Sequence, residues 1–173
     1  MATDGRSPAI IDTSVLVNFL ALDRADLLAR HPLHRFVVVD LVRDEVVKRT
    51  SSERLLAAFQ AGYVLPDGPP EAVAIEELAA FAAISLYDAL GRGECAASAA
   101  AHARGLPLFM DDGAAWKKVD LAFPGMAREG TATLVAALVK SGVVDVAQAD
   151  AMKADLEANH RLRLKFASFL EIL

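Results

Sequence analysis

Three short apolar runs, each followed by an acidic residue, constrain the fold of this chain more than any other feature of its sequence. They read AII before Asp12, FVVV before Asp40 and LPLFM before Asp111. Each run is apolar on both faces and precedes sequence with helical periodicity, as expected of strands buried inside a parallel sheet. A weaker fourth candidate, YVLP, spans residues 63–66.

Helical patterns separate these runs. They read SVLVNFLAL, RADLLARH, LVRDEVVKR, SERLLAAFQAG, EAVAIEELAAFAA and ECAASAAAHARG. Gly62 and Gly105 follow two of them, at the position where glycine commonly ends a helix. Strands that alternate with helices predict an α/β fold, here a three-layer sandwich whose mostly parallel central sheet carries helices on both faces.

The last third of the chain extends beyond this alternation. After the helical pattern GTATLVAALVKSG, Asp145 and Gln148 have the spacing of a capping box, which predicts a helix running to about Asn159. The remainder, HRLRLKFASFLEIL, fits a short edge strand, a helix or a tail that docks on a partner. We expect residues 1–173 to form one domain, with residues 145–173 as an extra C-terminal helical segment that mediates dimer or partner contacts.

Composition narrows the class of protein. The chain has 173 residues, 54% of them hydrophobic, which is enough for one domain with a sizeable core. A net charge of −5 argues against a surface that is basic throughout, but it leaves room for a local basic strip that binds RNA. The single cysteine, Cys95, cannot form an internal disulfide. No stretch approaches the roughly 20 apolar residues of a membrane helix, so we expect a cytoplasmic protein with no membrane partner.

Acidic residues fall where a parallel sheet would gather them. Residues just after a strand share the carboxyl edge of the sheet with the first turn of each returning helix, and ligands of open α/β proteins bind at this edge. Asp12, Asp111 and Asp112 follow predicted strands. Glu45 lies about one turn into the helix after the second strand, and Glu94 opens the alanine-rich helix.

Each of these acids also has a structural interpretation of its own. Asp12 and Asp112 can cap helices, Glu94 suits a first helical turn, and Glu45 suits an exposed surface. Gathered together they repel one another unless a cation lies among them. Oxygen ligands without histidine or cysteine favour Mg²⁺ or Mn²⁺, ions that assist displacement at phosphorus. We therefore predict a site for one of these ions, with Asp12, Glu94, Asp112 and Asp111 as ligands.

Four stretches resemble the PIN-domain nucleases, a family that includes the VapC-like toxins of bacterial toxin–antitoxin pairs. They are IIDTSVLVNFL, LVRDEVVKR, GRGECAASAAAHARGLPLFMDD and GTATLVAALVKSGVV, and together they span most of residues 9–144. The third stretch is the most specific of the four. Many PIN domains have an acid that opens an alanine-rich helix, then a Gly-Leu-Pro-Leu strand, then an acid beyond its end; here the acids are Glu94 and Asp112.

The resemblance implies a PIN-like fold and metal-dependent hydrolysis of RNA, leaving a 3′-hydroxyl and a 5′-phosphate. It implies that Asp12, Glu45, Glu94 and Asp112 form the catalytic pocket and that Mg²⁺ or Mn²⁺ is the cofactor. It further implies a homodimer and, for a toxin, an antitoxin protein as partner. Glu94 after Gly93, where many toxins have Asp, is similar to a less-characterised subgroup of the family.

Polar residues near the same edge are candidates for substrate binding: Ser14, Asn18, Arg92 and Lys117. A solvated helix face or a tolerated polar position explains them as well. The main alternative function is a catalytically inert PIN-like module for binding or assembly. Phosphotransfer domains fit less well, since Ser14 stands where a haloacid-dehalogenase-like phosphatase has a second Asp.

Overall fold

The computed structural model describes residues 5–68, 73–160 and 162–173, which form an α/β fold around a five-stranded sheet. All pairings between its strands are parallel, in the order β3-β2-β1-β4-β5. The strands are β1 (Ser7–Ile11), β2 (His34–Val38), β3 (Leu65–Pro66), β4 (Leu108–Phe109) and β5 (Arg128–Glu129). The predicted α/β class is confirmed, and the sheet is parallel throughout these strands.

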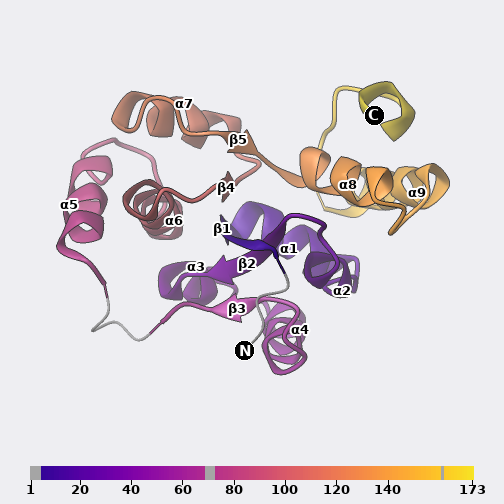
Figure 1. The fold of residues 1–173 in the computed structure, drawn as a ribbon, viewed down its shortest axis with the longest axis horizontal. Helices are drawn as coiled ribbons and strands as arrows, with labels where there is room; N and C mark the ends of the chain where they lie inside the picture. The colour runs from indigo at the N-terminus through magenta and orange to yellow at the C-terminus, as the bar shows by residue number, and fades with distance from the viewer. Residues whose placement is uncertain (1–4, 69–72, 161) are drawn as a thin grey trace.

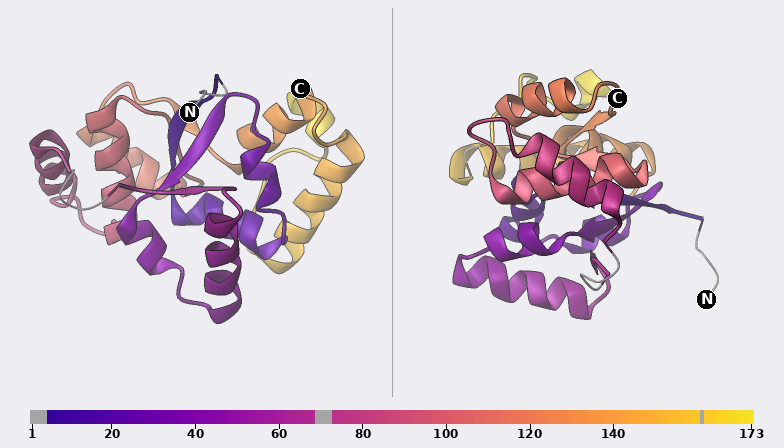
Figure 2. Two further views of the ribbon diagram at one scale, coloured as in Figure 1. Left: turned by 60° about the horizontal axis from the view of Figure 1, so that its bottom comes forward. Right: turned by 90° about the vertical axis from the view of Figure 1, so that its left-hand side faces the viewer.

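Helices cover both faces of the sheet. They are α1 (Thr13–Ala21), α2 (Asp26–Ala29), α3 (Asp40–Glu45), α4 (Arg49–Gln60), α5 (Ile75–Ile84), α6 (Arg92–Arg104), α7 (Gly113–Ala122), α8 (Thr131–Lys140), α9 (Val146–Asn159) and the 3₁₀ helix η2 (Phe169–Ile172). Figures 1 and 2 show α1, α2, α8 and α9 on one side of the sheet and α5, α6 and α7 on the other. In addition, α3 packs against α6 and α4 against α1. The arrangement matches the expected three layers.

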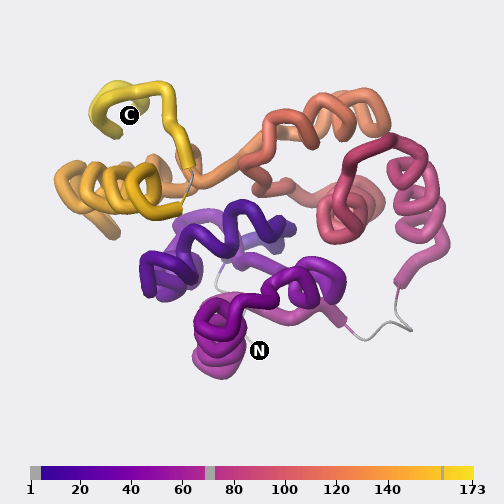
Figure 3. Tube along the Cα trace, turned by 180° about the vertical axis from the view of Figure 1, so that it is seen from behind, coloured from indigo at the N-terminus to yellow at the C-terminus, as the bar shows by residue number. Residues whose placement is uncertain are grey.

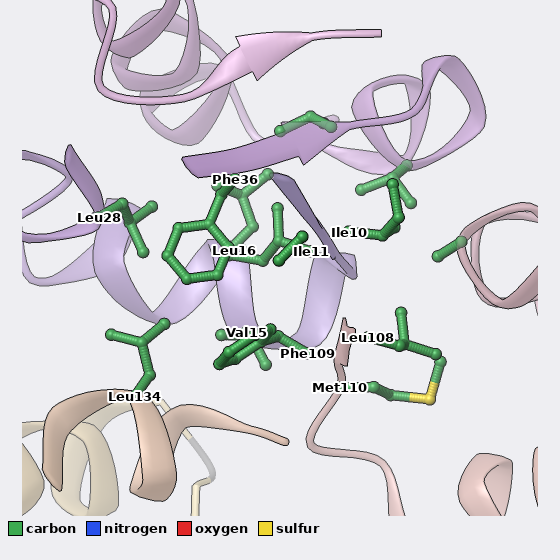
Figure 4. Packing of buried hydrophobic residues seen from close by; sticks show 14 of the residues in the cluster. Ile10, Ile11, Val15, Leu16, Leu28, Phe36, Leu108, Phe109, Met110 and Leu134 are labelled. Atoms are coloured by element: carbon green, nitrogen blue, oxygen red, sulfur yellow. The ribbon is translucent and has the colours of Figure 1, made fainter. Parts of the chain in front are cut away.

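The register of the central strands explains their apolar sequence. Ile10 pairs with Leu108 and Ile11 with Phe109, and all four are buried. Because successive side chains of a strand point to opposite faces, these pairs alternate between the two helical layers. Figure 4 shows Ile11 and Phe109 on the side of Leu134 from α8, with Ile10 and Leu108 on the other side. Both faces of β1 and β4 are therefore core.

β5 is not among the strands that the sequence predicts. It contains two residues, Arg128 and Glu129, and no apolar run marks it. The strand exists because it continues the ladder of β4: the backbone amide of Met110 donates to the carbonyl of Glu129 at 2.9 Å. This pairing brings the N-terminus of α8 to the carboxyl edge of the sheet, next to the end of β4.

The predicted helix ends are confirmed at several places. The Asp145 carboxylate accepts a hydrogen bond from the Gln148 amide at 2.7 Å, and the Asp145 amide donates to the Gln148 side chain at 2.9 Å. This capping box opens α9, which ends at Asn159 as expected. Gly62 and Gly105 follow α4 and α6 with φ of 70° and 62°, a left-handed conformation that favours glycine.

The segment after α9 folds back along its own chain (Figure 3). Phe169 is buried, and its backbone amide and the hydroxyl of Ser168 donate to the carboxylate of Asp150 on α9, at 2.8 and 2.7 Å. The Phe166 and Phe169 rings meet edge to face, with centroids 5.0 Å apart. The segment lies against α9 of its own chain and ends in a 3₁₀ helix, so it is neither the edge strand nor the partner-bound tail considered from the sequence. Its role in dimer or partner contacts stays a prediction.

Candidate functional site

Asp12 lies directly after β1 and caps the N-terminus of α1. Its Oδ2 accepts hydrogen bonds from the amide and the hydroxyl of Ser14, at 2.9 and 2.6 Å. Its Oδ1 is buried and has no hydrogen-bond partner among the described residues. Burial raises the pKa of Asp12, and the negative charge of Glu45 raises it further. Since an ionised, buried oxygen without a partner is unfavourable, either a proton or a bound cation would stabilise this carboxyl group.

Glu45, the last residue of α3, holds together the starts of two other helices. Its Oε2 accepts a hydrogen bond from the Thr13 hydroxyl at 2.9 Å, and its Oε1 accepts one from the Gly93 amide at 2.7 Å. An amide at a helix N-terminus favours negative charge at this position. A Cβ at residue 93 would lie 2.3 Å from Oε2, so this approach requires glycine. No pattern in the sequence indicates this reason for glycine at residue 93.

Glu94 lies in the first turn of α6 and is half-buried. Its Oε2 accepts a hydrogen bond from the backbone amide of Gly91, the N-cap residue, at 2.8 Å. Burial raises the pKa of Glu94, and the negative charges of Asp12, Asp112 and Glu45 add to that effect. The predicted catalytic acids therefore lie within electrostatic reach of one another.

Asp112 lies just beyond β4 and caps α7. Its Oδ1 accepts hydrogen bonds from the backbone amides of Ala114 and Ala115, at 2.7 and 2.9 Å. The side chain is otherwise exposed to solvent. The structural interpretation of this residue as a helix cap thus holds for one of its oxygens, beside the predicted role as a ligand.

These carboxylates share one edge of the sheet but do not converge on one point. Within the described parts of the chain, no three acidic, histidine or cysteine side chains are grouped so as to hold a metal ion. The hydrogen bonds explain this: Glu94 and Asp112 turn back to the amides of their own helix ends. Freeing a capping side chain costs about 1 kcal/mol, which coordination of an ion can offset. With their side chains in these positions, the described residues do not form the predicted metal site.

Asp111 belongs to a second network beside these acids. Its Oδ1 accepts a hydrogen bond from the Thr131 amide at 2.8 Å, and its Oδ2 accepts from the Thr131 hydroxyl and the Asn18 side chain, at 2.6 and 2.9 Å. Burial raises the pKa of Asp111. A Cβ at Gly130 would lie 2.6 Å from Oδ1, so glycine is required here too. This network joins α1, β4 and α8, which gives Asp111 and Asn18 a structural role besides their predicted roles as ligand and substrate contact.

The other candidates for substrate binding differ in their surroundings. The hydroxyl of Ser14 donates to Asp12 and accepts a hydrogen bond from the Asp111 amide at 3.0 Å, so it ties the ends of β1 and β4 together. Arg92 is exposed in the first turn of α6, and Lys117 is exposed on α7. Contact of these two with a substrate stays a prediction.

A groove of about 740 Å³ opens beside Glu45. Its walls come from α1, from the segment that joins α3 to α4, from the first turns of α4 and from the end of α9. Lys48, Arg54 and His160 are the basic residues that line it. No motif in the sequence points to these three residues as a group. The only signal for Lys48 is its position three residues after a predicted catalytic acid, and only the fold brings His160 to the same place.

Comparisons with known proteins add little to this picture. No family model matches the chain, and no curated protein matches it. Among solved structures, the crystal structure of PAE2754 from Pyrobaculum aerophilum is similar with a TM-score of 0.46 and 16% sequence identity, over 79% of this chain and 94% of that one. A similarity of this extent identifies neither a family nor an activity. In the described part of the chain, no helix is both long and apolar enough to cross a membrane.

Proposed function

We propose that the chain is a Mg²⁺- or Mn²⁺-dependent ribonuclease that hydrolyses phosphodiester bonds at Asp12, Glu45, Glu94 and Asp112. The observation that carries the proposal is the Asp12 carboxylate, which is 1% exposed and has a buried oxygen without a hydrogen-bond partner among the described residues. An ionised carboxylate with one buried oxygen left without a partner is unfavourable. A cation bound at Oδ1 removes that cost and the repulsion among the neighbouring acids.

The donor set fits a hard divalent ion. Asp12, Glu94 and Asp112 supply carboxylate oxygens, the ligand type that Mg²⁺ and Mn²⁺ prefer. These three residues would hold the ion, whereas both oxygens of Asp111 already accept hydrogen bonds from Thr131 or Asn18. When bound, such an ion supplies Lewis-acid assistance to displacement at phosphorus.

The other residues of the site position these ligands. Ser14 holds Oδ2 of Asp12 through its amide and its hydroxyl, which fixes the direction of Oδ1. Glu45 is held by Thr13 and by the Gly93 amide, so its carboxylate has a fixed place in the wall of the groove.

The first test is thermal unfolding in EDTA, Mg²⁺ or Mn²⁺, for the wild type, Asp12→Asn and a control. Asp120→Asn on α7 is the control, because Asp120 is an exposed aspartate outside the acidic edge. An ion that binds only the folded state stabilises it by about 2.7 kcal/mol at a hundred times its Kd. We expect metal to raise the Tm of the wild type and of Asp120→Asn, but not of Asp12→Asn.

Cleavage of a labelled single-stranded RNA tests the activity itself. Hydrolysis should require Mg²⁺ or Mn²⁺, leave a 5′-phosphate, and be abolished in Asp12→Asn with the fold intact. Undiminished cleavage by that variant would refute the proposal. If the protein is a toxin, its expression should arrest growth, and Asp12→Asn should relieve the arrest.

A second candidate function is a PIN-like module that binds without catalysis. The observation in its favour is that Glu94 and Asp112 already serve as helix caps, and the described acids do not converge on an ion. A metal-dependent rise in Tm without any RNA hydrolysis supports this candidate against the nuclease.

A further inference from the structure

The segment that follows α9 lines two hollows at the carboxyl edge of the sheet. Asn159 and His160 line the 740 Å³ groove beside Glu45. Residues 162–166 line a second hollow of about 440 Å³, whose opposite wall is the end of β4, β5 and the start of α8. Residue 161 lies outside the described residues. We call the two hollows together the edge groove.

The walls of the two halves of the edge groove adjoin beside the acids. Asn18 lines the first hollow and Asp111 lines the second, and the Asn18 side chain donates a hydrogen bond to Asp111 at 2.9 Å. Glu45 lines the first hollow and is bonded to Thr13, the neighbour of Asp12 in the chain. The acidic cluster therefore lies close to the junction of the hollows.

Cations line both halves of the edge groove. Lys48 lies in the first hollow and Arg163 and Lys165 lie in the second, although the net charge of the chain is −5. Lys48 and Lys165 are exposed, and neither forms an ion pair within the described part of the chain. Positive charge on both sides of an acidic centre suits a polyanion that crosses this centre.

The third basic residue of the first hollow has a structural role. The guanidinium of Arg54 donates to the carbonyls of Leu20 and Ala21 at the end of α1, at 2.7 and 2.9 Å, and pairs with Asp23. It therefore joins α4 to α1, and we do not count it among the phosphate contacts.

We propose that the edge groove binds the sugar–phosphate backbone of a single-stranded RNA, with Lys48 contacting it on one side of the acids and Lys165 on the other. This inference rests on the proposed function and adds to it the path of the substrate. We commit to a single strand because it is flexible enough to follow both hollows past the acids. Each volume also lies in the range of small-ligand sites, about 300–1,000 Å³.

The test is fluorescence anisotropy of a labelled 12-nucleotide single-stranded RNA, titrated at several salt concentrations in EDTA to prevent cleavage. Lys48→Ala and Lys165→Ala each remove one predicted contact. Lys140→Ala is the matched control, since Lys140 is exposed at the far end of α8. For single strands, each phosphate contact contributes about 0.7 to the slope of log K against log salt. We expect the slope to decrease by about that amount in each single variant, by about twice as much in the double variant, and not in Lys140→Ala.

Two results would overturn the inference: an unchanged salt slope in the double variant, or stronger competition by duplex RNA than by the single strand. The metal-dependent Tm of the same variants separates this inference from the proposed function. If metal raises the Tm of the double variant as in the wild type and its RNA binding is unchanged, the RNA path is refuted but the proposed function is not. Weakened RNA binding in the double variant, with no metal response even in the wild type, refutes the metal site and supports the groove.

Discussion

The backbone amide of Gly93 donates a hydrogen bond to Oε1 of Glu45 at 2.7 Å, across a gap of 48 residues in the sequence. This bond fixes the end of α3 against the start of α6, and through Glu45 it also reaches Thr13 at the start of α1. A side chain at residue 93 would displace the Glu45 carboxylate from this position, since its Cβ would lie 2.3 Å from Oε2 of Glu45.

Gly93→Ala should therefore lower the free energy of unfolding by about 1–2 kcal/mol, measured in urea, because the new methyl group displaces the Glu45 carboxylate and breaks its hydrogen bonds to Gly93 and Thr13. Without the clash, replacing glycine by alanine in a helix would raise the free energy of unfolding by up to about 1 kcal/mol. The sign of the measured change therefore shows whether the clash occurs. Gly113→Ala, in the first turn of α7, is the control: its Cβ would lie 3.4 Å from the end of the Arg128 side chain, which can move. In a Glu45→Ala background, Gly93→Ala should no longer destabilise. Additive effects of the two substitutions would contradict the proposed contact.

Asp111→Asn separates a structural role from a ligand role. The Asp111 carboxylate accepts hydrogen bonds from Thr131 and Asn18. The NH₂ group of an asparagine at this position would point a hydrogen-bond donor at these donors. We expect a loss of roughly 2 kcal/mol in unfolding free energy, with the metal-dependent rise in Tm preserved. Loss of the metal response at unchanged stability would instead make Asp111 a ligand.

The sequence was sufficient to predict the class of fold because the strands are buried on both faces and so are continuously apolar. β5 escapes such a prediction, since Arg128 and Glu129 form a strand only through their pairing with β4. The capping box of Asp145 and Gln148 is a local motif and was predicted with the correct end of its helix.

The candidate site was predictable in its location but not in its hydrogen bonds. Topology places residues after strands at one edge, so the electrostatic proximity of Asp12, Glu94 and Asp112 follows from sequence order alone. No sequence pattern shows that Glu45 binds the Gly93 amide, since this contact depends on the packing of α3 on α6. The same holds for the groove wall formed by residues after α9, which only the folded tail brings to the acids.

The His31 side chain predicts how stability depends on pH. Burial lowers its pKa from 6.5 to about 4, with smaller contributions from His34 and Arg6. Below pH 6.5 the unfolded chain binds a proton at His31 that the folded chain excludes until about pH 4, so stability falls as the pH falls through this window. The loss reaches at most about 3 kcal/mol.

The measurement is the difference in unfolding free energy between the wild type and His31→Asn from pH 7.5 to pH 4. The Nδ1 of His31 accepts hydrogen bonds from the amides of Leu33 and His34, at 3.3 and 3.1 Å, and the Asn oxygen can replace this acceptor. Acids with raised pKa, such as Asp12 and Asp111, act in the opposite direction but are common to both proteins. As the pH falls, the free energy of unfolding of the wild type should decrease relative to that of His31→Asn. Parallel curves for the two proteins would contradict the prediction.

Phe169 links the stability of the tail to the proposed RNA path. It is buried against α9, and the Asp150 carboxylate holds its amide, whereas the adjacent Leu170 is 70% exposed. Phe169→Ala should cost about 3 kcal/mol by opening a cavity, as measured by urea unfolding. Leu170→Ala is the matched control and should change stability little, because its side chain already lies in solvent.

Loosening the tail also removes one wall of the edge groove, the wall that residues 162–166 provide. RNA affinity should therefore decrease in Phe169→Ala and stay constant in Leu170→Ala, while the metal-dependent rise in Tm persists in both because the acids lie on other elements. If Phe169→Ala loses stability but binds RNA as tightly as Leu170→Ala does, the tail contributes to the fold without shaping the path of the substrate.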